Sequence, residues 1–134
     1  MTSTAAARSE LYDALAAAFA GTGVVVARTR PAELATPLVY IDVAERRFAD
    51  ADGAPVVVVT LPVVAIVDGA DDEQVAALDD HGDLIWRCAL EVKAAPSVAV
   101  RADVDADGPR LRGLVTTVDV DVAHLTLCPD PDWS

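Results

Sequence analysis

In two segments of the chain, residues recur at the spacing that places them on one face of a helix. Within residues 4–20 the repeating positions are Arg8, Leu11, Leu15 and Phe19, with alanine filling the gaps. Within residues 71–95 they are Val75, Leu78, Ile85, Cys88 and Val92. Acidic residues open the second segment, which suits the positive end of a helix dipole. The pattern therefore predicts two helices, and Gly82 is a weak point at which the second is prone to split.

Five other segments show the alternation or the continuous apolar runs that are typical of strands. They are residues 24–28, 38–48, 56–67, 97–104 and 111–128. The sequence Asp-Ala-Asp-Gly at 50–53 is typical of a tight turn, so the second and third segments are predicted to form a long β-hairpin. Pro62 has no N–H to donate and indicates a bulge or an edge in that hairpin. A change of alternation predicts a second bulge near residues 123–124.

The order of the predicted elements is α-β-β-β-α-β-β, and no low-complexity linker divides them. The chain has 134 residues, which is the usual size of one domain. We therefore predict one domain over residues 1–134, with a core at about 5–128 and a short acidic tail at 129–134. The expected fold class is α+β, with a single, mostly antiparallel sheet and both helices packed on one face.

Composition and charge narrow the range of functions. The chain contains 26 alanines and 21 valines but only two each of Phe, Tyr and Trp, so its core must consist of small aliphatic side chains. Its net charge of −12 argues against a nucleic-acid binder and against docking on anionic lipid. Residues 1–48 hold five arginines and five acids, so the whole negative excess lies in residues 49–134.

The sequence contains no pattern that predicts export or membrane insertion. Glu10 and Asp13 interrupt the first apolar stretch, which a secretion signal does not tolerate. The longest apolar run, residues 54–67, is shorter than the ~20 residues of a membrane span. We therefore expect a soluble protein made in a cytoplasm. Cys88 and Cys128 are then two small core residues of a reducing compartment, with a disulfide between them as the alternative.

No group of residues predicts catalysis or a cofactor. Asp103, Asp105, Asp107 and Gly108 begin like a calcium loop, but position 114, where that loop needs a glutamate, is a leucine. Neither His81 nor His124 has a partner at metal-ligand spacing. The sequence has no nucleophile elbow and no phosphate loop, and its paired acids are expected to be solvated. We therefore predict a protein that is not an enzyme and holds no metal or cofactor.

The predicted hairpin favours assembly into a larger structure. Residues 56–67 are apolar on both faces, whereas two helices cover only one face of a sheet. An apolar face without cover is typical of an interface. The candidate interface residues here are Val57, Val59, Leu61 and Val63. The alternative is that the loop at residues 29–37 covers this face within the chain.

Two further groups are interface candidates. Arg46, Arg47, Arg110 and Arg112 lie near the two predicted hairpin turns, and arginine favours bidentate pairing with the carboxylates of a neighbour. The alternative is that these four charges are solvated and keep one end of the sheet soluble. Trp133 in the C-terminal tail has the character of an interface anchor, unless the end of the chain is disordered.

The chain resembles the tail terminator proteins of long-tailed bacteriophages, especially those of actinobacterial hosts, and the related head–tail joining proteins. The resemblance is carried by length, by the opening helix around residues 7–15, by the long hairpin, by the acidic start of the second helix and by the closing strand from 113 to 128. It implies a structural virion protein at the head-proximal end of the tail, assembled in the host cytoplasm. It also implies a ring, typically a hexamer, that stops polymerisation of the tail tube protein and joins the tail to the head connector.

A ring and its channel place demands on the residues of this chain. A closed ring needs two different contact surfaces on each subunit. A channel that passes DNA without binding it benefits from acidic walls, and Asp103, Asp105, Asp119 and Asp121 are the candidates to face the lumen. Two other functions stay open. One is another neck or connector protein, and the other, from a different class, is a small cytosolic ligand-binding α+β domain, which a deep apolar pocket would favour.

Overall fold

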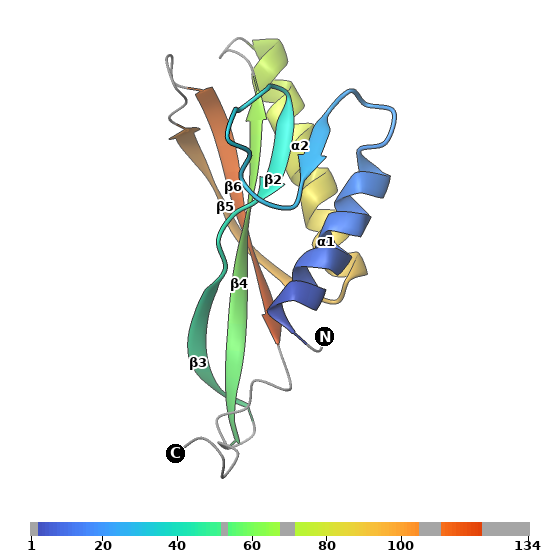
Figure 1. Ribbon diagram of the computed structural model, residues 1–134. Coiled ribbons are helices and arrows are strands. Elements are labelled where there is room, and N and C mark those ends of the chain that lie inside the picture. The colour runs from blue at the N-terminus through green and yellow to red at the C-terminus, as the bar shows by residue number, and fades with distance from the viewer. Residues whose placement is uncertain (1–2, 52–53, 68–71, 105–110, 122–134) are drawn as a thin grey trace.

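The computed structural model describes residues 3–51, 54–67, 72–104 and 111–121 (Figure 1). Within these ranges it describes the side chains of residues 3–47, 57–67, 72–97 and 113–120. The elements in chain order are α1 (Thr4–Ala18), β1 (Val25–Ala27), β2 (Leu38–Ile41), β3 (Glu45–Ala51), β4 (Ala54–Val67), α2 (Asp72–Glu91), β5 (Ala95–Val104) and β6 (Leu111–Asp121).

The strands form one six-stranded sheet with the order β1-β2-β4-β6-β5, and β3 pairs with β4. The β1–β2 pair is parallel, and the other four pairs are antiparallel. The helices lie together on one face of this sheet (Figure 1). The prediction of an α+β fold with a mostly antiparallel sheet and both helices on one face is therefore confirmed.

Helix α1 begins where its sequence supplies a cap. The Ser3 hydroxyl accepts a hydrogen bond from the Ala6 N–H at 2.9 Å and satisfies one of the free donors of the first turn. Ala7, Leu11 and Leu15 form its buried stripe, as the periodicity predicts. The helix ends at Ala18, just before Gly21 adopts a positive φ of 77°.

Helix α2 runs without a break through Gly82, so the predicted weak point does not divide it. A Cβ atom at position 82 would lie 2.7 Å from Cδ2 of Leu114 on β6, so the glycine allows the helix to approach the sheet closely. Burial of Leu78 before Gly82 and of Ile85 after it offsets the ~1 kcal/mol that glycine costs a helix. The helix ends at Glu91, four residues before the predicted end at residue 95.

The predicted strand at residues 38–48 is two strands, β2 and β3, separated by residues 42–44. The cause lies on the facing strand, because the Asp42 N–H donates to the Pro62 carbonyl at 2.8 Å but Pro62 has no N–H to donate in return. The other side of β4 is unaffected, and Pro62 keeps its register with Thr117 of β6. The irregularity predicted at Pro62 is therefore confirmed as a break in the partner strand.

Both faces of β4 are covered between Val59 and Ile66, and this corrects the prediction of an exposed apolar patch over that part of the strand. Val59, Leu61 and Val63 are fully buried beneath α1 and α2, so they belong to the core of the single chain and not to its surface. On the opposite face, Leu34 from the loop at residues 29–37 packs against a second buried cluster. That cluster consists of Leu38, Tyr40, Val64 and Ile66. The alternative of cover by the chain's own loop therefore holds for the part of the sheet around β2.

The last two strands differ from the prediction mainly at their ends. Strand β5 begins at Ala95, two residues early, and its pairing with β6 shifts register between Pro96 and Ala99. Strand β6 is described as far as Asp121, so the predicted continuation to residue 128 and the bulge at 123–124 lie outside the described residues.

Candidate functional site

The prominent feature of the molecule is a two-stranded arm, which we define as residues 45–51 and 54–60. Its pairs run from Glu45 opposite Thr60 to Ala51 opposite Ala54. Strand β6 joins β4 only from Val58 onward, so within the described residues 54–57 pair with β3 alone. The arm extends past the two helices at the lower end of the view (Figure 1). The long hairpin predicted from the sequence therefore exists, and in the part of the chain that the structure describes its outer end is a two-stranded ribbon.

The base of the arm is held by a polar network on three strands. Arg47 donates to Oδ2 of Asp119 at 3.2 Å, and the Thr60 hydroxyl donates to Oδ1 of the same carboxylate at 2.6 Å. The ion pair contributes less than about 1 kcal/mol, because the Arg47 side chain is 58% exposed. Its effect is therefore to orient the arm against β6 rather than to stabilise the fold.

The sheet register assigns these residues to opposite faces of the arm base. Thr60 lies opposite Glu45 and Asp119, whereas its neighbour Val59 lies opposite Arg46 and is buried under the helices. Because strand residues alternate between faces, the Asp119 network is on the face away from the helices. Arg46 is exposed on the helix side, and no ion pair joins it to the described residues.

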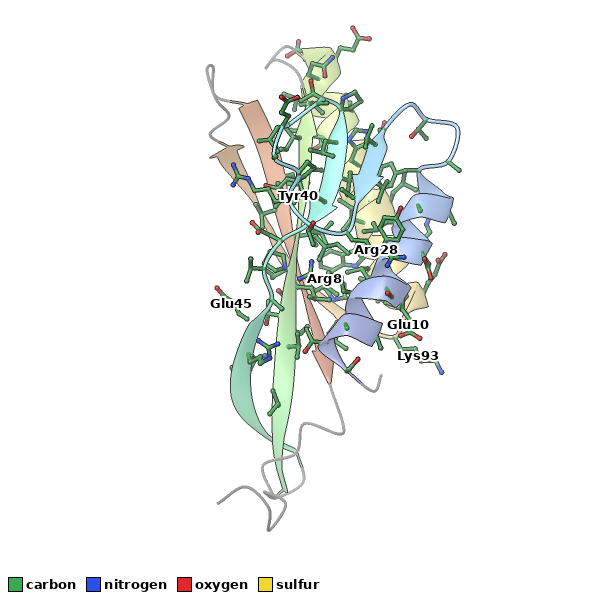
Figure 2. The ribbon with its side chains drawn as sticks, in the orientation of Figure 1. Arg8, Glu10, Arg28, Tyr40, Glu45 and Lys93 are labelled. Atoms are coloured by element: carbon green, nitrogen blue, oxygen red, sulfur yellow. The ribbon has the colours of Figure 1, made fainter. Side chains whose placement is uncertain are left out.

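A second polar contact fixes the break between β2 and β3. The Arg8 guanidinium donates from Nη1 to the carbonyls of Arg28 at 2.7 Å and Ile41 at 2.8 Å, and from Nη2 to that of Asp42 at 2.8 Å. Figure 2 shows Arg8 where α1 faces the sheet. Burial lowers the pKa of Arg8, and the nearby Asp42 carboxylate opposes this effect. One sign of this role is visible in the sequence, where an arginine stands on the apolar stripe of the first helix.

An open cavity of about 860 Å³ lies at the base of the arm. Its charged lining residues are Glu10, Asp13, Arg47, Glu91, Lys93 and Asp119, and its apolar ones are Val58, Val92, Ala95 and Val120. Glu10 and Lys93 lie on the same side of the molecule, at the lower ends of the two helices (Figure 2). This mixed and open lining differs from the deep apolar pocket that a small-molecule binding domain would favour.

The other predicted site residues are dispersed. Val57 is half-buried and packs against the core. Arg112 pairs in register with Asp103 at the end of the sheet remote from Asp121, roughly 30 Å away at ~3.3 Å per strand residue. The structure therefore brings Arg47 and Asp119 together and leaves Arg46 on the opposite face. It does not bring together the two arginine groups or all the acidic lumen candidates. Arg110, Asp105 and Trp133 lie outside the described residues.

Cys88 is a free core cysteine, 1% exposed, and its thiol donates to the Ala14 carbonyl at 3.4 Å. Burial raises the pKa of this thiol to about 11, and the nearby Glu91 carboxylate acts in the same direction. The thiol is therefore protonated and unreactive near neutral pH. Cys128 lies outside the described residues, so the alternative of a disulfide is not tested by the geometry.

Within the part of the chain that the structure describes, no cluster of His, Cys, Asp and Glu side chains has the arrangement of a metal site. No helix in that part is long and apolar enough to cross a membrane. Compared with known proteins, the chain matches no family model and no curated protein sequence. The arm and its base are therefore the candidate site on the strength of geometry alone.

Proposed function

We propose that this protein is a structural component of a bacteriophage virion, the tail terminator. In this function several copies, expected to be six, form a ring on the end of the tail tube. The ring stops polymerisation of the tube protein and presents a surface to the head connector. The phage assignment is supported by the resemblance in chain length and element order, and the assembly into a larger structure is supported by the arm.

The arm is the observation that carries the proposal. An isolated two-stranded ribbon is marginally stable in water, and residues 54–57 have β3 as their sole described partner. By sequence, this outer part includes Phe48, Val56 and Val57. A long and partly apolar ribbon of this kind gains cover when a neighbouring protein packs against it. A subunit whose arm carries apolar residues of this kind is suited to a place inside a virion.

The charge distribution supports a channel that DNA passes through. Each chain carries a net charge of −12, so a ring of these chains repels phosphate. Asp119 lies on the sheet face opposite the helices, where Glu45 is also placed by the register. We propose that this face lines the lumen. Arg47 neutralises part of the charge of Asp119, so Glu45 is the freer of the two acids.

The direct test is to delete the coding gene from the phage genome that carries it and to examine the particles by electron microscopy. A tail terminator is expected to leave tubes that overrun their normal length and carry no heads. Tails of normal length beside heads that leak DNA would instead move the protein to the connector. Complete and infectious particles would overturn both functions in the virion.

A shortened arm tests the observation itself. Replacing residues 49–56 by Asn-Gly keeps the pair Phe48–Val57, and with it the contact of Val57 with the core, and removes the outer part of the ribbon. The shortened protein should fold, since its core is untouched, but should fail to restore normal tail length to the deletion phage. The matched control is Asp52→Asn, which keeps the full length of the arm. Normal tails with the shortened arm would contradict the role we give it.

A further inference from the structure

Among the described residues, the large apolar side chains that stay exposed fall into two places. Val25 and Val43, at 55% and 78% exposure, are near β1 and the end of β2. Trp86 and Leu90, at 42% and 57%, are on α2. Scattered apolar residues on a surface need no explanation, but Trp86 and Leu90 are one helical turn apart and form a continuous pair.

Contacts made by other residues of α2 fix the direction in which this pair points. Cys88 faces α1, because its thiol contacts Ala14, and His81 also faces α1, where it meets the ring of Phe19 edge-on. Gly82 faces β6 through its close approach to Leu114. Each step of four residues along a helix rotates the side chain by roughly 40° beyond a full turn. Counted from Gly82, which faces β6, the positions 86 and 90 are therefore rotated progressively away from α1. The pair therefore lies on the flank of α2 that is nearest β5.

This flank is acidic as well as apolar. Asp79 and Asp83 are exposed and precede Trp86 by seven and three positions, which places them on the same stripe of the helix. We call Asp79, Asp83, Trp86 and Leu90 the α2 stripe. A surface that fits this stripe needs apolar side chains together with positive charge.

The opposite edge of the same molecule has this character. Val25 is in β1, the outermost strand on that side, and Arg28 follows it. The Arg28 guanidinium lies 4.7 Å from the centre of the Tyr12 ring, and Figure 2 shows it beside α1. Arg8 joins the backbone of Arg28 to that of Ile41 and so brings Val43 into the same region. Val25 pairs with Leu38, so its side chain is on the face away from the helices. We therefore define the β1 edge by Arg28 and Val43.

We propose that the α2 stripe of one copy packs against the β1 edge of the next copy. Trp86 and Leu90 then cover Val43, and Asp79 and Asp83 face Arg28. Because the two surfaces occupy opposite sides of the chain, the contact is head-to-tail and repeats around a ring until it closes. This inference rests on the proposed ring and names the surfaces that build it. The arm stays outside this contact and is available to the tail tube.

Site-specific cross-linking tests the pairing of the two surfaces. Val43→Cys and Leu90→Cys are made separately in a Cys128→Ser background, where the buried Cys88 is protected. A short bismaleimide should join the two variants when they are mixed and assembled, and should join neither variant to itself. Cross-links within Leu90→Cys alone would indicate a two-fold contact and overturn the proposal. Rings that form without any cross-link in the mixture would overturn it as well.

Charge reversal supplies an independent measurement of the same contact. We expect Asp83→Arg and Arg28→Asp each to raise the concentration needed for assembly by about tenfold or more, as sedimentation measures it. The double variant should recover most of this loss, because the two charges again have opposite signs. Asp80→Arg is the matched control, since residue 80 lies on the part of the α2 surface nearer α1, and it should assemble like the original chain.

The outcomes separate this inference from the proposed function. If the original chain forms rings that neither charge reversal affects, the surfaces are wrong and the ring stands. If the original chain stays monomeric at every concentration and the deletion phage makes normal tails, the proposed function itself fails. If the α2 stripe binds the tail tube protein instead, Trp86→Ala will leave the rings intact and abolish tube capping, which overturns the contact between copies.

Discussion

The guanidinium of Arg8 lies 2.8 Å from the carbonyl oxygen of Asp42, at the point where β2 ends and the chain turns toward the arm. The same group binds the carbonyls of Arg28 and Ile41, so one side chain of α1 joins the ends of two strands. The break opposite Pro62 leaves this part of the backbone without a regular ladder. Arg8 replaces the missing strand contacts and thereby sets where the arm begins.

We expect Arg8→Ala to lower the free energy of unfolding by about 3 kcal/mol. The substitution leaves three carbonyls without their charged donor, and hydrogen bonds to charged groups contribute ~1.5–3 kcal/mol each before water replaces part of the loss. Urea denaturation followed by circular dichroism measures the change. Arg87→Ala, an exposed arginine on α2, is the control and should stay within about 0.5 kcal/mol of the original chain. Equal stability of the two variants would contradict the role of Arg8.

Thr116→Val should stabilise the protein by about 1 kcal/mol, since it removes a buried hydroxyl that costs free energy without a partner. Thr116 is fully buried, and among the described residues its Oγ1 has no hydrogen-bond partner. Thr60→Val is the matched control on the neighbouring strand. It removes the hydroxyl that donates to Asp119 and should therefore be destabilising. The melting temperatures of both variants test these two expectations. A loss of stability for Thr116→Val would show that the hydroxyl of Thr116 is satisfied.

The pair Gly82 and Leu114 should behave as a coupled unit. A Cβ at position 82 meets Cδ2 of Leu114 at 2.7 Å, so Gly82→Ala gains helix propensity but forces that side chain to move. In a Leu114→Ala background the clash is absent, and the same substitution should gain the full ~1 kcal/mol expected for alanine over glycine. A double-mutant cycle measures the difference. Additive effects would mean that α2 does not depend on this close approach.

Stability should fall as the pH drops from about 7 to about 5, because His81 resists protonation in the folded protein. Burial lowers its pKa, the Asp80 carboxylate opposes this effect, and the buried Nδ1 has no hydrogen-bond partner in the part of the chain that the structure describes. The unfolded chain therefore takes up the proton at a higher pH than the folded one, and acid favours unfolding. The measurement is the free energy of unfolding of the original chain minus that of His81→Gln at each pH in this range. The subtraction removes the contribution of the 22 acids, because both proteins contain them. If the stabilities of the two proteins changed in parallel with pH, the role given to His81 would be contradicted.

The sequence was informative where a local pattern decides the structure. The periodicity around Leu11 and Ile85 placed both helices, and the Asp-Gly turn placed the hairpin. It was less informative where a contact between residues distant in the chain determines the structure. Alternation shows that both faces of residues 56–67 are apolar but not that the helices bury Leu61 or that Leu34 covers the other face. The break at residues 42–44 depends likewise on Pro62 of the facing strand. Pro62 indicates an irregularity in the hairpin, but no local pattern places it at residues 42–44.

Ring formation should strengthen when the ionic strength rises from about 0.01 M to about 0.15 M, where the Debye length falls from ~30 Å to ~8 Å. Each chain carries a net charge of −12, so copies repel one another over distances that low salt leaves unscreened. The contact proposed between Asp83 and Arg28 acts at short range, where the same screening removes less energy. The repulsion is therefore reduced more than the attraction, and sedimentation should show a shift from monomer to ring. Assembly that is constant over this range, or that decreases, would mean that net repulsion does not limit ring closure.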